Sequence, residues 1–103
     1  MFGDEQIGSV RFEFDPAKSD ANMRKHGIDF IEAQALWLDV DLMGLPARSE
    51  SEDRFLFVGM ISGRHWSAIV TYRDEIIRLI SVRRARQREV RAYEGGGSGQ
   101  EVR

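Results

Sequence analysis

The sequence lacks cysteine altogether and has only two prolines, two histidines and two lysines in its 103 residues. The absence of cysteine excludes disulfide frameworks, thiolate zinc sites and cysteine nucleophiles, and two histidines argue against a histidine-rich metal site. No apolar run approaches the roughly 20 residues that a membrane-spanning helix needs. The first nine residues contain two acidic and no basic side chains, unlike a secretory signal. We therefore expect a cytoplasmic protein with no membrane partner, no metal and no cofactor.

What is present is the composition of one folded domain. Apolar residues make up 42% of the chain and charged residues 31%, which excludes intrinsic disorder. Two domains of this total length would each have too little core to be stable. We expect an N-terminal extension over residues 1–9, a single domain over 10–94 and a flexible, glycine-rich tail over 95–103.

The charges are divided unequally along the chain. Residues 1–60 contain 6 basic and 12 acidic side chains, whereas residues 61–103 contain 9 arginines and 5 acidic side chains. Arginine keeps its charge at any working pH, and its planar donors match phosphate oxygens. Although the net charge of the whole chain is −2, this distribution favours a nucleic acid as partner.

The first part of the domain carries clear local signals. Residues 10–14 alternate apolar and charged side chains, which predicts a half-buried strand. A helix should run from Pro16 to His26, because Asp15 suits the N-cap and Gly27 suits the left-handed position that ends a helix.

A second helix should begin at Asp29, since Glu32 completes a capping box with it. After it the chain alternates strand and turn patterns, and turns are expected at Ser62-Gly63 and at Arg73-Asp74. A short strand, three longer strands and a final helix are predicted over residues 41–45, 54–62, 65–72, 75–82 and 84–94. The expected fold is a small α+β domain in the order β-α-α-β-β-β-α, with an antiparallel meander sheet and the helices packed on one face.

Seven arginines lie between Arg73 and Arg91. In the last predicted strand, regular alternation places Arg78 on the opposite face to Arg83. In the helix that follows, three arginines recur at i, i+4 and i+7 and form one basic stripe: Arg84, Arg88 and Arg91. Several guanidinium groups that converge on one surface could hold a phosphodiester and stabilise the dianionic transition state of its cleavage. A solvated helix face with ordinary arginine–glutamate pairs would show the same pattern.

Four other side chains are candidates for such a site. His26 could transfer a proton near neutral pH and Lys25 could hold a phosphate, but both cations also suit the C-terminal dipole of their helix. Glu89 could act as a base or orient an arginine. Tyr93 could stack on a nucleobase, although core packing is the commoner role of such a tyrosine.

Several segments taken together resemble one known family. They are FEFDPAK (Phe12–Lys18), Asn22, KHGIDFIEA (Lys25–Ala33), RLISVRRARQRE (Arg78–Glu89) and Tyr93-Glu94. In this order they resemble the BrnT family of toxins over about residues 10–94. The resemblance implies a RelE/ParE-like fold and a ribonuclease activity that arrests translation. It also implies a BrnA-like antitoxin with a ribbon-helix-helix domain, which neutralises the toxin and connects it to operator DNA.

The resemblance and the arginine pattern lead to one hypothesis about the reaction. We expect a metal-independent endoribonuclease, in which the ribose 2′-hydroxyl attacks the adjacent phosphate and cations gather around that phosphate. The expected catalytic residues are Lys25, His26, Arg73, Arg83, Arg84 and Glu89. The expected additional RNA-binding residues are Arg78, Arg88, Arg91 and Tyr93. A non-enzymatic nucleic-acid-binding or corepressor module would use the same arginines for affinity alone.

Overall fold

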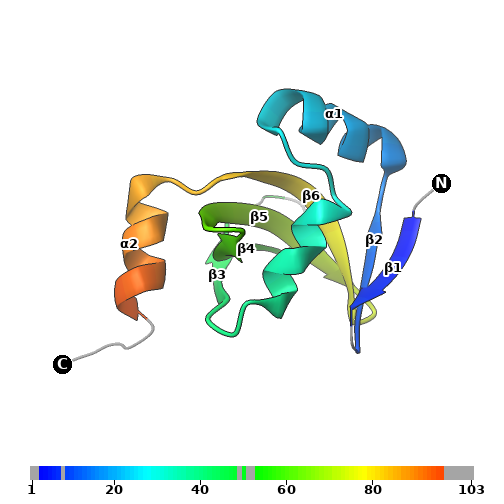
Figure 1. Cartoon of the computed structure of the whole chain (residues 1–103). Coiled ribbons are helices and arrows are strands. Elements are labelled where there is room, and N and C mark those ends of the chain that lie inside the picture. The colour runs from blue at the N-terminus through cyan, green and yellow to red at the C-terminus, as the bar shows by residue number, and fades with distance from the viewer. Residues whose placement is uncertain (1–2, 8, 49, 51–52, 97–103) are drawn as a thin grey trace.

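The computed structural model describes residues 3–7, 9–48, 50 and 53–96, which form one six-stranded sheet and three helices (Figure 1). The strands are β1 (Gly3–Ile7), β2 (Val10–Phe14), β3 (Met43–Ala47), β4 (Arg54–Ile61), β5 (Arg64–Arg73) and β6 (Ile76–Arg84). The helices are α1 (Pro16–His26), the 3₁₀-helix η1 (Glu32–Leu38) and α2 (Gln87–Gly96). None of these helices has the length and apolar character that a bilayer-crossing segment requires. The predicted α+β class is confirmed.

The sheet is mixed, so the prediction of a purely antiparallel meander is wrong. Strands follow the order β1-β2-β6-β5-β4-β3, and β2 pairs with β6 in parallel. The chain leaves β2 through α1 and η1 and re-enters the sheet at the far edge, which leaves β2 beside the last strand. The predicted order also omits two strands. Strand β1, within the expected extension, pairs with β2, and β3 lies two residues further along the chain than the short strand expected over 41–45.

Helix α1 has the predicted limits because both of its ends are capped. The carboxylate of Asp15 accepts a hydrogen bond from the Ala17 N–H at 2.9 Å. At the other end Gly27 has φ 78°, and its N–H donates to the Met23 carbonyl at 2.9 Å. A glycine takes this left-handed conformation without the steric cost that a side chain would add.

The second predicted helix has its expected capping box, but it is a 3₁₀-helix and begins at Glu32 instead of Asp29. Asp29 accepts from the Glu32 N–H at 2.8 Å, and Glu32 accepts from the Asp29 N–H at 3.2 Å, so the capping box is confirmed. The buried apolar side chains of η1 are Ala33 and Leu36, and Phe30 just before it is buried as well. Because they are spaced three apart, a helix of three residues per turn points all of them at the sheet.

Asn22 connects α1 to the part of β6 that β2 does not reach. Its side-chain amide donates to the carbonyls of Ile28 at 2.8 Å and Val82 at 2.9 Å. Its side-chain oxygen accepts from the Val82 N–H at 3.1 Å. Asn22 is buried, and one carboxamide therefore pairs three backbone groups that would otherwise lack partners.

Replacing Asn22 by alanine should therefore lower the free energy of unfolding by about 2 kcal/mol, because buried peptide groups lose their partners. Denaturant unfolding would measure this change. The exposed Ala21, its neighbour on α1, gives the control Ala21→Ser, which should change the stability by less than about 0.5 kcal/mol. An Asn22→Ala variant as stable as the control would contradict the bridging role.

The hairpin of β5 and β6 differs from the prediction in its turn. The turn at Ser62-Gly63 is confirmed, with φ 50° and 82°, but the next turn is Asp74-Glu75, with φ 52° and 70°. Strand β5 therefore continues through Arg73. Strand β6 also runs further than predicted, to Arg84, and α2 begins at Gln87 instead of 84. The Ala85 N–H donates to the His65 carbonyl at 3.1 Å, which prolongs strand pairing beyond the expected helix start.

An irregular register in this hairpin changes which face the arginines occupy. Ile69 pairs with Ser81 but Val70 pairs with Leu79, so Ile80 is an extra residue in β6. One extra residue inverts the alternation, and Arg78 and Arg83 therefore lie on the same face. The prediction that they project from opposite faces is wrong for this reason.

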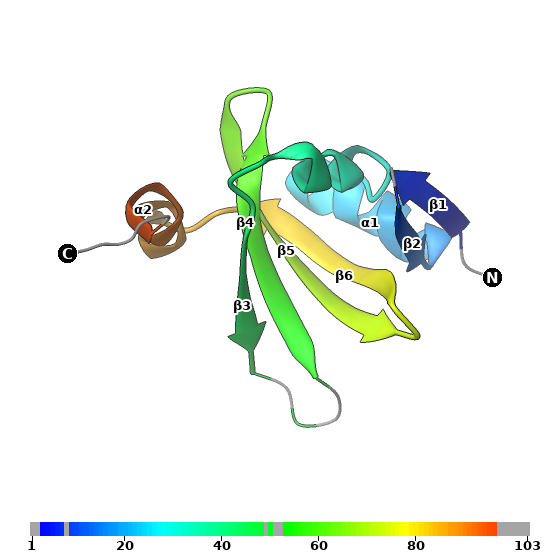
Figure 2. The ribbon, with the colours of Figure 1, turned by 90° about the horizontal axis from the view of Figure 1, so that it is seen from below.

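The two faces of the sheet are covered differently. One face carries the hydrophobic core, in which Phe12 of β2, Leu36 of η1 and Phe30 just before η1 are fully buried. Helix α2 lies apart from α1 and η1 (Figure 2). Its Glu89 contacts Ser67, whose side chain is on the face away from the core. The helices therefore do not all pack on one face, and we call the face of Ser67 the open face.

Candidate functional site

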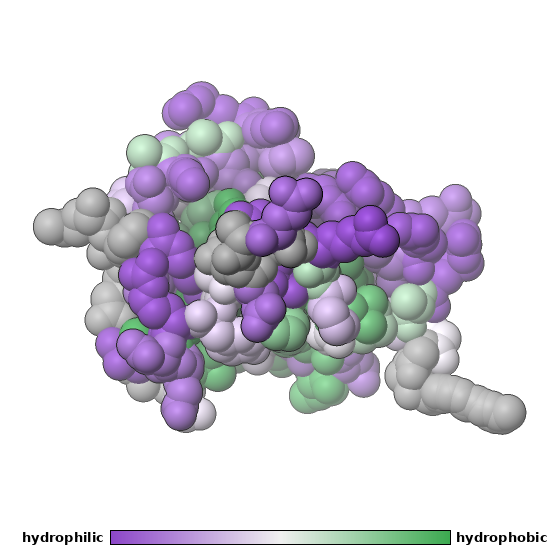
Figure 3. All heavy atoms as spheres, turned by 180° about the vertical axis from the view of Figure 1, so that it is seen from behind, coloured by the Kyte–Doolittle hydropathy of each residue, from purple (hydrophilic) through white to green (hydrophobic). Residues whose placement is uncertain are grey.

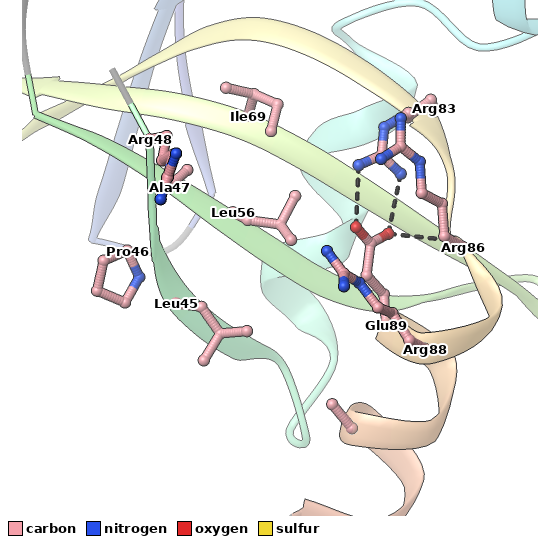
Figure 4. A pocket seen from close by; sticks show the side chains of 11 residues that line it. Leu45, Pro46, Ala47, Arg48, Leu56, Ile69, Arg83, Arg86, Arg88 and Glu89 are labelled. Carbon is pink, nitrogen blue, oxygen red and sulfur yellow. Dashed lines mark hydrogen bonds and ion pairs between the residues drawn. The ribbon is translucent and has the colours of Figure 1, made fainter. Parts of the chain in front are cut away.

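The open face contains a hollow of about 590 Å³ between β3, β4, β5, β6 and α2. Its floor is apolar, and apolar side chains are visible between hydrophilic ones on this side of the molecule (Figure 3). Four arginines and one glutamate give its lining a net charge of +3 (Figure 4). The floor includes Leu45, Leu56 and Ile69, and the charged residues are Arg48, Arg83, Arg86, Arg88 and Glu89.

Arg83 and Glu89 form a two-pronged ion pair at one end of the hollow. Both terminal nitrogens of Arg83 donate to the carboxylate, at 2.9 Å each. The same carboxylate accepts from the Ser67 hydroxyl at 2.8 Å and from the Arg86 N–H at 2.9 Å. Glu89 thus joins the end of β6, the middle of the sheet and the first turn of α2, and it fixes the Arg83 guanidinium.

These contacts determine the protonation of the pair. The hydrogen bonds from Arg83 outweigh the effect of burial and lower the pKa of Glu89 from 4.5 to about 2. The same hydrogen bond raises the pKa of Arg83 above its usual range. A carboxylate with so low a pKa is a poor proton acceptor near neutral pH. Of the two roles expected for Glu89, this geometry therefore favours orienting an arginine.

Lys25 and His26 lie in a second, smaller hollow of about 270 Å³ between α1 and β6. Ser81 lines this second hollow, while its cross-strand partner Ile69 lines the first. The two hollows therefore lie side by side across β6, although they share no lining residue.

Two of the expected site arginines lie elsewhere on the open face. Arg78 and Arg73 contact the Glu13 carboxylate at 3.1 and 3.4 Å. Arg73 is six residues along β5 from Ser67, the partner of Arg83, which corresponds to about 20 Å. Arg73 and Arg83 therefore do not contact the same phosphate.

The other arginines are divided between the two faces. Arg84 pairs with Trp66 in the sheet, and its guanidinium lies 5.5 Å from the centre of that indole ring, on the core side. It is therefore on the opposite face to Arg83. Arg88 lines the first hollow, whereas Arg91 is exposed on α2 and lines neither hollow.

Tyr93 is engaged in a contact that the sequence did not indicate. Its hydroxyl donates to the Asp39 carboxylate at 2.5 Å, and that carboxylate also accepts from the Met60 N–H at 2.8 Å. Burial and the bond to Asp39 raise the pKa of Tyr93 to about 12. Burial opposes the ionisation of Asp39, but its hydrogen bonds outweigh it and lower the pKa. The ring packs edge-on against His65, with centroids 5.4 Å apart. Tyr93 therefore holds α2 against the end of η1.

Replacing Tyr93 by phenylalanine should keep this ring packing but remove the bond to Asp39. We expect the free energy of unfolding to fall by about 1.5 kcal/mol, the usual contribution of a hydrogen bond to a charged group. Denaturant unfolding would test this, with Tyr72→Phe as control because the Tyr72 side chain is 46% exposed. Equal effects of the two substitutions would contradict the role of the Tyr93 hydroxyl.

Sequence reasoning missed three residues of this region. Arg48 and Arg86 line the hollow, and Ser67 contacts its Glu89. Arg86 lies in the segment Arg78–Glu89 that resembles the family, whereas Ser67 and Arg48 stand in no recognisable motif. The arginine count pointed to Arg86, whereas nothing in the sequence distinguishes Ser67. Within the described residues, no three histidine or carboxylate side chains are grouped so that they could hold a metal ion.

One comparison with known proteins identifies a family for this chain. Residues 14–89 match the model of a family described as the ribonuclease toxin BrnT of type II toxin–antitoxin systems. No curated protein matches the sequence. The matched span includes both hollows up to Glu89 and covers most of the domain. These observations define the class of protein as a ribonuclease toxin that is paired with an antitoxin. The chain belongs to the BrnT family.

Proposed function

We propose that the protein is a metal-independent endoribonuclease that cleaves RNA by attack of a ribose 2′-hydroxyl on the adjacent phosphate. The observation that carries the proposal is the first hollow, where four arginines and one glutamate surround an apolar floor. The arginines can hold phosphate oxygens while the floor accepts a nucleobase. Arginine side chains supply the positive charge that the dianionic transition state requires.

Arg83 is the arginine best prepared for this role. Glu89 holds its guanidinium from one side, which removes the orientational freedom that an arginine in solution would lose on binding. Because Glu89 also offsets the charge of Arg83, the net positive charge of the hollow comes from the exposed arginines Arg48, Arg86 and Arg88.

Lys25 and His26 are the proposed groups for proton transfer or for positioning the neighbouring phosphate. An RNA strand that crosses β6 would contact both hollows, because adjacent strands are only about 4.8 Å apart. His26 can accept a proton from the 2′-hydroxyl or return one to the leaving 5′-oxygen.

The decisive experiment is cleavage of a defined RNA by the purified protein in EDTA. We expect products with a 2′,3′-cyclic phosphate, and no cleavage at a position where a single 2′-deoxynucleotide replaces the ribonucleotide. Cleavage that requires a divalent cation, or that proceeds at the 2′-deoxy position, would overturn the mechanism. In cells we expect cleavage of RNA to arrest translation in the cytoplasm.

The second candidate function is a module that binds nucleic acid, or serves as a corepressor, without turnover. It is favoured by the ion pair of Arg83 with Glu89 and by the contacts of two other arginines with Glu13, because paired arginines are also common in purely structural roles. Binding of RNA without cleavage, and expression without growth arrest, would support this alternative.

The proposed antitoxin partner is a BrnA-like protein with a ribbon-helix-helix domain. This domain would bind operator DNA, and the toxin would associate with the DNA only as part of the complex with its antitoxin. We expect acidic or apolar segments of this partner to cover the arginines of the first hollow. Size-exclusion chromatography of the co-expressed pair would show the complex, and a partner that never co-elutes would exclude this arrangement.

A further inference from the structure

The open face carries a second group of arginines that lies outside both hollows. Arg73 and Arg78 both contact the carboxylate of Glu13, and we call these three residues the Glu13 cluster. Glu13 and Arg78 are mostly buried, with side chains 15% and 21% exposed, whereas the Arg73 side chain is 56% exposed. The Arg73 guanidinium is therefore accessible to solvent, while Glu13 and Arg78 beside it are held in place by the surrounding protein.

The sheet register gives the separation between this cluster and the Arg83 site. Ser67 pairs with Arg83 and Thr71 pairs with Arg78, so the two positions are four residues apart along β5. Four residues of an extended strand span about 13 Å. Because the extra residue in β6 reverses its alternation, both arginines project from the open face and can contact one ligand.

The surface between the two positions is apolar. Leu45 pairs with Leu56, and Leu56 pairs with Ile69, so these side chains form a strip across β3, β4 and β5. All three line the first hollow. Going along β5, the open face thus presents a cationic position at Ser67, an apolar strip at Ile69 and a second cationic position at Thr71. A single-stranded RNA that lies along this line could place a phosphate at each cationic position and its intervening bases over the apolar strip.

We propose that the Glu13 cluster is a second phosphate-binding subsite, which holds the RNA chain at a distance from the phosphate that is cleaved. This inference rests on the proposed function, because it assumes that the Arg83 site binds RNA. A separation of about 13 Å corresponds to roughly four nucleotides at the 3.4 Å spacing of a stacked strand. The substrate is then an RNA segment of at least five or so nucleotides, and Arg73 and Arg78 act in binding, away from the reacting atoms.

The test compares a short and a long RNA. Oligonucleotides of 3 and 10 nucleotides with 2′-O-methyl groups, which lack the attacking hydroxyl, are bound to the full chain and followed by fluorescence anisotropy. Arg78→Gln and Arg73→Gln should each weaken binding of the 10-mer by about tenfold, the effect of one charge-assisted contact. They should also reduce its salt slope by about 0.7, the value for one phosphate of a single strand. Binding of the 3-mer should not change.

Arg24→Gln is the matched control, because Arg24 is exposed on α1 and lines neither hollow. This substitution removes the same charge as the other two. If Arg78→Gln and Arg73→Gln affect the 10-mer no more than the control does, or weaken the 3-mer equally, the subsite is overturned. If the Arg78→Gln variant does not fold, the Arg73→Gln variant alone decides the test, because the Arg73 side chain is largely exposed and its replacement should not unfold the protein. Arg83→Ala separates the two proposals: weaker binding of both RNAs upholds the main site, whereas unchanged binding of both overturns the proposed function itself.

Discussion

Replacing Arg83 by alanine should slow RNA cleavage about 100- to 1000-fold, the usual effect of removing one preorganised donor to a developing charge. The expectation follows from the geometry of the pair with Glu89, which fixes the guanidinium at the end of the hollow before RNA binds. Single-turnover cleavage of a labelled RNA at saturating protein would measure it. Arg83→Lys should recover little activity, because an ammonium group cannot make the two-pronged contact.

The stability of the variant must be measured beside its activity. Arg83→Ala leaves the carboxylate of Glu89 buried without its ion-pair partner, which is destabilising. The double variant Arg83→Ala/Glu89→Ala should recover stability and remain inactive. Arg24→Ala, outside both hollows, should cleave RNA at the rate of the parent protein. Full activity in either variant that lacks Arg83 would remove Arg83 from the mechanism.

The free energy of unfolding should fall by about 3 kcal/mol as the pH falls from 5 to 2, through the titration of Glu89. The pKa of this carboxyl group is lowered from 4.5 to about 2 in the folded protein. Above the unfolded value both states are ionised, so the Arg83 contact contributes fully. At lower pH the unfolded chain takes up the proton first, and the advantage of the folded state is lost as the pH approaches the folded pKa.

Denaturant unfolding at a series of pH values would show this loss. Glu89→Gln should be less stable than the parent at pH 6, and the difference should diminish as the pH decreases, because the glutamine does not titrate. Asp39, whose pKa is also lowered, contributes a slope of the same sign to both proteins. Parallel curves for the two proteins between pH 5 and pH 3 would contradict the role of Glu89.

The parts of the fold that sequence could predict are those fixed by neighbouring residues. The caps at Asp15 and Gly27 defined α1, and the box of Asp29 and Glu32 located the start of η1. The parallel pairing of β2 with β6 joins segments more than sixty residues apart, and no local pattern determines such a partner. The extra residue at Ile80 is equally invisible, since it breaks the alternation on which prediction of strand faces depends.

The site was predictable in composition but only partly in arrangement. The excess of arginine in the second half pointed to the end of β6 and the start of α2, and in the structure Arg83, Arg86 and Arg88 line one hollow there. The sequence could not show that Arg73 is at the other end of the hairpin, because that depends on where β5 turns. Nor could it show that Arg84 faces the core side, which follows from strand β6 continuing to that residue.

The strand β3 borders the hollow and forms one edge of the sheet, and it contains Pro46. A proline has no N–H to offer, and β3 is only five residues long, so this edge is a poor template for the strand of another molecule. The same feature that discourages edge-to-edge aggregation keeps the rim beside the arginines accessible. The protein can thus display an uncovered sheet face at high concentration without polymerising through that edge.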